Sequence, residues 1–185
     1  MGTDHESRLI GGVEPREIVI AEYDPAWPRR YEAHAGIIRD ALGGTLLRIE
    51  HVGSTSVPGL AAKPIIDILA VVPDSADESS YVPQLGAAGY SLRVREPDFF
   101  EHRMLRTAAR DVHVHVYSPG VPEIGRMIAF RDRLRRSAED RARYEAVKRQ
   151  LAARSWPDMN AYADAKTAVV ESIMAVAAVE RGESQ

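Results

Sequence analysis

One run of apolar residues restricts the possible folds of this sequence more than any other feature. Residues 63–72 read KPIIDILAVV, so seven of the last eight positions are apolar. A nearly continuous apolar run of this kind is typical of a strand that is buried on both faces of a sheet. Asp67 interrupts the run, and a lone buried carboxylate is unfavourable unless it is paired or bound to a metal. We therefore expect a layered α/β or α+β fold in which Asp67 has a specific role.

Further strands and helices are expected on both sides of this run. A helix over 25–42 would begin after Asp24, a residue type that caps helices, and would end at the glycine pair after Leu42. From Pro122 onward the pattern is helical, with a capping box that starts at Ser137. A short helix is expected over 82–88 and a last helix over 158–180. The other expected strands occupy residues 17–21, 46–52, 90–94, 100–106 and 111–117. The sequence thus predicts a mixed sheet with flanking helices and a C-terminal three-helix segment.

Length, charge and composition exclude several classes of protein. The 185 residues suit a single domain over 16–182, whose helical part is 120–182, after a flexible N-terminus over 1–15. The net charge of −3 argues against a nucleic-acid partner, and the absence of cysteine excludes disulfides and thiolate sites. No apolar run reaches the ~18 residues of a membrane span, and the N-terminus lacks the apolar core of a signal peptide. We therefore expect a cytoplasmic protein without a membrane partner.

The segment before the apolar run is rich in residues that handle anions. Gly53 allows an anion to approach the backbone, Ser54 offers a hydroxyl, and free N–H groups at a helix start favour negative charge. Lys63 adds a positive charge. The expected phosphate-binding residues of this segment are His51, Gly53, Ser54, Thr55 and Lys63. The alternatives are that the Gly-Ser pair is a tight turn with a cap, and that Asp67 braces the loop or pairs with Lys63.

Two histidines on a later strand suggest a metal site. His113 and His115 are two residues apart, so they share one face of their strand, and the same alternation places Asp111 on that face. Together with Asp67, which we expect to be catalytic along with both histidines, they would form a nitrogen and oxygen site suited to Zn²⁺ or Mn²⁺. Mg²⁺ requires more oxygen ligands, for which Asp111 and Glu50 are candidates. The alternative is that both histidines simply face solvent.

Longer motifs resemble a known family. The stretches IEHVGSTSVPGLAAKPIIDI, HVHV, AFRDRLR and AYADAKTAVVESI are similar to the GrpB family, also called UPF0157, from about Glu17 to Met174. The resemblance implies a nucleotidyltransferase-like fold, also called polymerase-β-like. In that superfamily a Gly-Ser pair holds nucleotide phosphates and two acids, one residue apart on the next strand, hold divalent metal. Leu69 stands at the position of the second acid, so this sequence supplies only one of the two acids of that pattern.

Two further basic residues lie in these motifs. Arg131 in AFRDRLR is expected either to contact phosphate or to form an ion pair inside the fold. Lys166 lies four residues after Tyr162, hence on the same helical face, and is expected to contact the ligand.

Three functions are consistent with these observations. The first is metal-assisted transfer of a nucleotidyl or phosphoryl group to a small acceptor, with Mg²⁺ or Mn²⁺ as cofactor and Zn²⁺ as an alternative. The second is a degenerate module that binds a nucleotide or coenzyme A without catalysis, because Leu69 replaces an acid and GrpB relatives occur fused to dephospho-CoA kinase. The third is a metal-dependent hydrolase built on His113, His115 and Asp67. In each case the expected partner is a phosphorylated small molecule, for which a nucleotide is the leading candidate.

Overall fold

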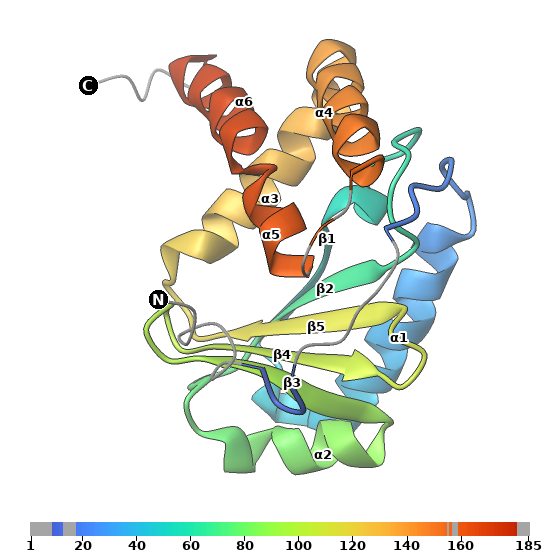
Figure 1. The fold of residues 1–185 in the computed structure, drawn as a ribbon. Coiled ribbons are helices and arrows are strands. Elements are labelled where there is room, and N and C mark those ends of the chain that lie inside the picture. The colour runs from blue at the N-terminus through green and yellow to red at the C-terminus, as the bar shows by residue number, and fades with distance from the viewer. Residues whose placement is uncertain (1–8, 13–17, 155, 157–158, 181–185) are drawn as a thin grey trace.

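A five-stranded mixed sheet organises the protein (Figure 1). The computed structural model describes residues 9–12, 18–154, 156 and 159–180. The strands are β1 (Arg48–Val52), β2 (Ile66–Val71), β3 (Tyr90–Glu96), β4 (His102–Thr107) and β5 (Val112–Tyr117), and their order in the sheet is β1-β2-β5-β4-β3. Strand β2 pairs antiparallel with β1 and parallel with β5, and the other neighbours are antiparallel. The expected α+β class is therefore confirmed.

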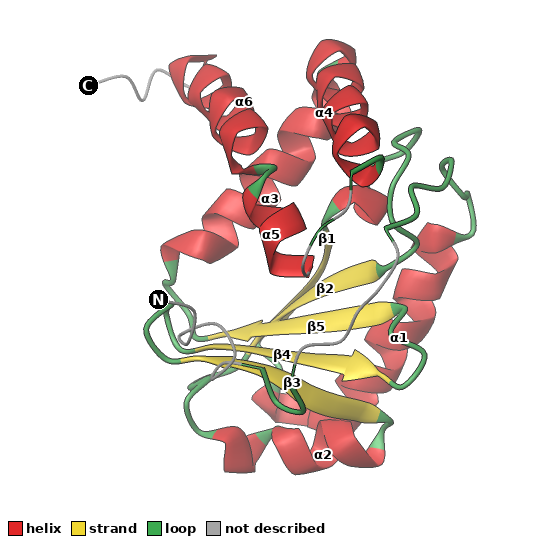
Figure 2. Ribbon diagram, viewed as in Figure 1, coloured by secondary structure: helices red, strands yellow, loops and turns green. Residues whose placement is uncertain are grey.

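Helices cover both faces of this sheet (Figure 2). Helices α1 (Trp27–Leu42) and α2 (Val82–Ala87) lie on one face. On the opposite side lie α3 (Pro122–Arg136), α4 (Ala138–Ala152), α5 (Met159–Asp164) and α6 (Thr167–Glu180). None of the helices in the described ranges is long and apolar enough to cross a membrane.

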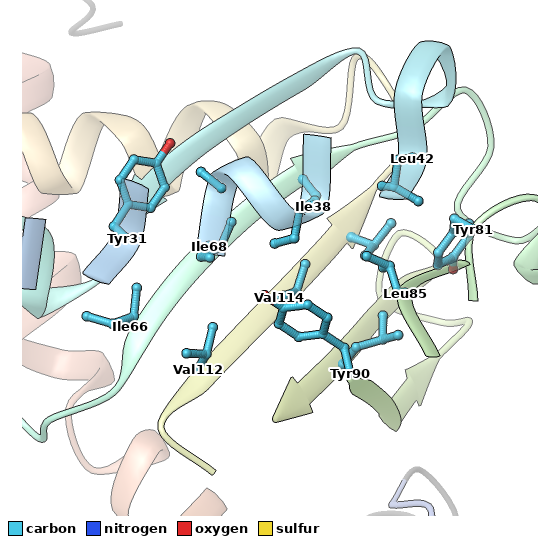
Figure 3. Packing of buried hydrophobic residues seen from close by; sticks show 14 of the residues in the cluster. Tyr31, Ile38, Leu42, Ile66, Ile68, Tyr81, Leu85, Tyr90, Val112 and Val114 are labelled. Carbon is cyan, nitrogen blue, oxygen red and sulfur yellow. The ribbon is translucent and has the colours of Figure 1, made fainter. Parts of the chain in front are cut away.

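The alternation of side chains along β2 and β5 gives each face its chemistry. Ile66 and Ile68 of β2 and Val112 and Val114 of β5 pack with α1 and α2 in the main core (Figure 3). The opposite face of β2 carries Asp67, Leu69 and Val71, of which the last two pack against α3. The expectation that this strand is buried on both faces is confirmed, and Asp67 is the polar position on the face toward the C-terminal helices.

Two expected elements differ from the structure. Within 17–21, residues 18–20 form no strand and Ala21 makes only an isolated bridge with Ala62, while Glu17 lies outside the described residues, as does most of the expected flexible segment 1–15. The helix expected over 158–180 is two helices, α5 and α6. No proline or glycine occurs between them, so the local sequence contains none of the usual causes of a break.

The expected helix starts are close to those observed. Helix α1 begins at Trp27, after Asp24, whose Oδ1 accepts a hydrogen bond from the Ala26 N–H at 2.8 Å. Ser137 caps α4, because its hydroxyl oxygen accepts from the Asp140 N–H at 3.1 Å.

Candidate functional site

A pocket of about 430 Å³ lies where the β1–β2 loop, the sheet and the C-terminal helices meet. The loop contributes Gly53, Ser54, Thr55 and Lys63, and the strands contribute Asp67, His113 and His115. The helices contribute Glu123, Met127, Phe130, Tyr144, Lys148, Tyr162 and Lys166, and Ile20 and Ile65 complete the lining. Most of the residues expected to bind a ligand from the sequence are therefore brought together.

Within the Gly-Ser pair, Gly53 has a backbone conformation that is essentially restricted to glycine. Gly53 has φ 69° and ψ −174°, a region that residues with a side chain avoid. A Cβ at this position would lie 3.0 Å from Asp67 Cβ and 3.1 Å from Asp67 Cγ, and closer still to the Oδ2 oxygen. The glycine thus lets the loop backbone pass directly over the Asp67 carboxylate. The next residues form the 3₁₀ turn η3 (Ser54–Ser56), which starts at this point.

Buried hydrogen bonds hold the β1–β2 loop in place. The Thr55 hydroxyl donates to the Ile65 carbonyl at 3.0 Å, so it accepts from His51 Nε2 at 3.1 Å. His51 is 7% exposed and stacks on Tyr31 with ring centroids 4.6 Å apart. Burial, together with the nearby arginines, lowers the pKa of His51 to about 4 against the opposing charge of Asp67. Although it was expected to bind ligand, His51 lies outside the pocket lining as a neutral brace.

Asp67, His113 and His115 form a cluster on the sheet side of the pocket. Asp67 Oδ1 lies 3.6 Å from His113 Nδ1 and 3.4 Å from His115 Nε2. One ligand atom from each residue lies within 4.8 Å of the other two. The β2–β5 register explains this proximity, because Asp67 is directly opposite His113 and Leu69 is opposite His115. Burial raises the pKa of Asp67, but hydrogen bonds and positive charge from the histidines outweigh it and hold that pKa well below its usual range.

A chain of hydrogen bonds orients His115 from outside the pocket. His102 Nδ1 lies 2.7 Å from Glu96 Oε2, and His102 Nε2 lies 3.1 Å from His115 Nδ1. Burial lowers the pKa of His102 despite the opposing effect of Glu96, so we assign this histidine as neutral with its proton on Nδ1. His115 then donates from Nδ1, and its Nε2 lies 3.4 Å from Asp67 Oδ1. This contact is favourable when either a proton on Nε2 or a cation lies between the two atoms.

The donor atoms of this cluster fit one type of metal better than another. Two imidazoles and one carboxylate form the nitrogen-rich set that Zn²⁺ and Mn²⁺ accept, with room for further ligands. Mg²⁺ prefers an oxygen-rich octahedral set, which these three residues do not provide. Asp67, His113 and His115 are thus suited to hold a single ion of the zinc or manganese type.

The other expected metal ligands lie elsewhere. Glu50 Oε2 accepts from Arg131 Nη1 at 2.9 Å, and Arg131 also donates to the His51 carbonyl at 3.0 Å. Arg131 therefore forms an internal ion pair with Glu50, which was the expected alternative to phosphate contact. Asp111 precedes β5 and pairs with Arg30 of α1 at 2.8 Å, on the opposite side of the sheet from His113. The expectation that Asp111 shares a face with the histidines was wrong, because the strand begins only at Val112.

A wall of basic and aromatic residues faces the cluster. Lys63 and Lys166 place their Nζ atoms 5.0 Å and 4.8 Å from the centroid of the Tyr162 ring. Lys148 lies 4.8 Å from the Tyr144 ring centroid and donates a hydrogen bond to the Ala61 carbonyl.

Lys148 was not predicted as a pocket residue, although its position in the helical pattern indicates burial. It follows Tyr144 by four residues and precedes Leu151 by three, so it stands on the buried stripe of its helix, where a lysine is unusual.

The fold and the pocket define an α+β protein whose mixed sheet carries an imidazole–carboxylate cluster opposite a lysine wall. The family model described as GrpB protein matches residues 17–176. The chain therefore belongs to the GrpB family, as its motifs predicted.

Individual relatives agree with this assignment. A UPF0157 protein of Halalkalibacterium halodurans is 52% identical over 176 residues, which cover 93% of this chain and 90% of that protein. The crystal structure of conserved protein GrpB from Enterococcus faecalis superposes with a TM-score of 0.78 at 34% identity, and covers 88% of this chain and 99% of that one. A dephospho-CoA kinase of Mycolicibacterium paratuberculosis is 32% identical over 169 residues, which are 77% of this chain and 42% of that protein.

Proposed function

We propose that the pocket binds a phosphorylated small molecule of the nucleotide type and promotes transfer of its phosphoryl or nucleotidyl group with a divalent metal. One observation carries this proposal. The lysine wall and the Asp67–His113–His115 cluster line a single pocket, and the Gly53–Ser54 turn borders it. Positive charge to hold phosphate and donors for a metal are the two requirements of this chemistry.

Each group of residues has a distinct part in the proposed reaction. Lys63, Lys148 and Lys166 would neutralise the phosphate oxygens, and the backbone beside Gly53 would admit them closely because no side chain stands there. Asp67, His113 and His115 would hold the metal, which would polarise a phosphoryl oxygen and stabilise its developing charge. His102 and Glu96 would keep the His115 ring in the orientation that points Nε2 into the pocket.

A second candidate is a module that binds the same class of ligand without catalysis. Leu69, which stands in place of a second acid, is fully buried against α3, so Asp67 is the only carboxylate that β2 contributes to the pocket. The dephospho-CoA kinase relative, of which this chain covers 42%, makes a coenzyme A precursor a reasonable ligand to test. The third candidate, a metal-dependent hydrolase, differs from the first only in using water as the acceptor.

One set of assays separates the three candidates. The protein is mixed with nucleotides and coenzyme A species in EDTA, Mg²⁺, Mn²⁺ or Zn²⁺, binding is followed by thermal shift, and products are followed by ³¹P NMR. A ligand at 100 times its dissociation constant should stabilise the fold by roughly 2.7 kcal/mol. Metal-dependent turnover with an added acceptor supports transfer, turnover with water alone supports hydrolysis, and binding in EDTA without turnover supports the binding module.

Two matched variants test the role of the cluster. Asp67→Asn should abolish turnover while the fold is kept, because it removes the only carboxylate of the cluster. Asp111→Asn makes the same chemical change on the far side of the sheet and should retain turnover. Full activity of Asp67→Asn would refute the proposed mechanism.

A further inference from the structure

Lys148 has unusual surroundings for a lysine. It stands on the buried stripe of α4, is 2% exposed and lines the pocket. Lysine is rarely buried unless it is paired, yet Lys148 forms no ion pair with a carboxylate of the described residues. The carboxylate of Glu145 is nearby, but its Oε2 accepts from the Ala61 N–H at 3.1 Å and its Oε1 accepts from Arg149 Nε at 3.0 Å. The amine of Lys148 therefore lies in the pocket wall without a direct acidic partner.

Two contacts fix the position of this amine. Lys148 Nζ donates a hydrogen bond to the Ala61 carbonyl and lies 4.8 Å from the centroid of the Tyr144 ring. Because the side chain also lines the pocket, a ligand in the pocket can approach the nitrogen. A neutral amine keeps the hydrogen bond to Ala61, since one N–H is enough to donate it, and its lone pair remains for a ligand. A fixed and accessible nitrogen is the geometric requirement for a lysine nucleophile.

The surrounding charges favour the neutral form of this amine. Burial and, next, the positive charge of Lys166 lower the pKa of Lys148 to about 7. Arg149 and Lys63 act in the same direction, and Glu145 opposes them. A lysine becomes nucleophilic near neutral pH when it is desolvated or lies next to another cation, and Lys148 meets both conditions.

The neighbouring groups suit a ligand that carries both a carbonyl group and a negative charge. Burial lowers the pKa of Lys166 and the charge of Asp67 opposes that shift, whereas the charges around Lys148 are mostly positive. We therefore assign Lys166 as the cation that attracts the anionic group and Lys148 as the nucleophile. The Tyr162 hydroxyl has no hydrogen-bond partner among the described residues, and the residue lines the same pocket. Because burial raises the pKa of Tyr162, its hydroxyl stays protonated and is suited to donate to a carbonyl oxygen.

We propose that Lys148 condenses with the aldehyde or ketone group of a compound that also carries an anionic group such as a carboxylate. The lone pair of the nitrogen attacks the carbonyl carbon and forms a C–N bond. The nitrogen then loses both of its protons, the former carbonyl oxygen gains two and leaves as water, and a C=N bond remains as an imine. Neither a metal nor a phosphate group takes part, so this inference goes beyond the proposed function and does not rest on it.

Reductive trapping with glyoxylate, a small aldehyde that carries a carboxylate, tests the proposal. The full chain is mixed with glyoxylate in EDTA at neutral pH, cyanoborohydride reduces any imine to a stable secondary amine, and peptide mass spectrometry locates the label. The sequence contains only the lysines Lys63, Lys148 and Lys166, and the α-amino group is mapped separately.

The expected result is a label that forms selectively on Lys148. At about pH 7 roughly half of the Lys148 amines are neutral, against fewer than about one in a thousand for an ordinary lysine. We expect labelling of Lys148 to start at least roughly tenfold faster than labelling of either other lysine. Equal rates, or a label that falls mainly on Lys63 or Lys166, would overturn the proposal.

Unfolding provides a control for the role of the fold. In guanidinium chloride the burial and the neighbouring cations are lost, so the three lysines should label slowly and alike. Only the neutral amine reacts, so in the folded protein labelling of Lys148 should rise as the pH approaches about 7 and level off above it. If Lys148 reacted as fast in the unfolded chain as in the folded one, the fold would not activate it.

Matched variants and a second aldehyde test the parts of the site. Lys148→Arg keeps the charge but forms no imine, so the selective label should disappear. Lys166→Met removes the nearest cation and should slow labelling of Lys148 at neutral pH by roughly fivefold, the effect of a pKa higher by about one unit. Arg39→Gln removes an exposed charge of α1 and should label as the wild type does. Acetaldehyde, which lacks the carboxylate, should show a smaller ratio of folded to unfolded labelling than glyoxylate, and equal ratios would refute the anionic requirement.

Thermal unfolding shows whether each variant is folded, and the outcomes separate this activity from the proposed reaction. A selective label on Lys148 in EDTA, without any metal-dependent turnover of phosphorylated compounds, would support imine formation and refute transfer. Metal-dependent turnover without a selective label on Lys148 would support the transfer reaction and refute imine formation.

Discussion

Replacement of Gly53 by alanine tests the central geometric feature of the pocket. The backbone at Gly53 lies in a region that is essentially restricted to glycine, and forcing a residue with a Cβ into it costs about 1–3 kcal/mol. The new Cβ would also lie 3.0 Å from Asp67 Cβ and nearer to its carboxylate, and overpacking of this kind costs a further 1–3 kcal/mol or so. Partial movement of the loop relieves some of both terms. We therefore expect Gly53→Ala to lower the free energy of unfolding by about 3 kcal/mol.

Urea unfolding measures this loss, and thermal unfolding should show a midpoint lower by roughly 6–12 °C for a chain of this size. Gly36→Ala is the matched control, since Gly36 lies within α1 and a Cβ there meets nothing within 4 Å. That variant should be more stable than the wild type by about 0.5–1 kcal/mol. The double variant Gly53→Ala with Asp67→Ala should recover about 1 kcal/mol relative to additivity, because the clashing carboxyl group is gone and only the Cβ of residue 67 remains close. If Gly53→Ala unfolded within 0.5 kcal/mol of the wild type, the reasoning about this loop would be wrong.

Three further predictions follow from other contacts. The pKa of His51 is lowered to about 4 in the folded protein, so between pH 6.5 and pH 4 the unfolded chain binds a proton that the folded protein does not bind. The free energy of unfolding should therefore drop by up to about 3 kcal/mol as the pH falls through that window. His51→Gln should make the plot of unfolding free energy against pH flatter in the same window. His102→Ala should weaken zinc binding by roughly 10–100-fold in a chelator competition titration, because His115 loses the contact that orients it, and an unchanged affinity would exclude that role. Lys148→Met should raise the free energy of unfolding without ligand, since it removes a buried amine that forms no ion pair within the described residues, and a less stable variant in urea would contradict this account.

Much of the sheet could be predicted from residue patterns because burial leaves a direct mark on them. The apolar run around Asp67 and the alternation of His113 and His115 with valines specify which face each side chain occupies, and the structure brings these three residues together. The Gly53–Ser54 turn could be identified because few backbone conformations require glycine.

The parts that escaped prediction depend on long-range packing. Asp111 was expected beside the histidines, but Arg30 holds it on the far side of the sheet, and no local pattern reveals that pairing. The break between α5 and α6 occurs in a sequence with good helical propensity. Lys148 could have been recognised on the buried stripe of α4, but its convergence with Lys63 and Lys166 depends on how the helices pack over the sheet.

The pocket is assembled from distant parts of the chain, and this has a consequence for folding. The strand side is complete by Tyr117, whereas Lys148, Tyr162 and Lys166 come from helices that are synthesised later. A phosphorylated ligand held between the two sides would contact both, so it would act as a noncovalent crosslink that fastens the helical layer to the sheet. Amide hydrogen exchange in α5 and α6 should then slow on ligand binding far more than exchange in β4. The exchange rate of these two helices would therefore measure the fraction of protein with ligand bound.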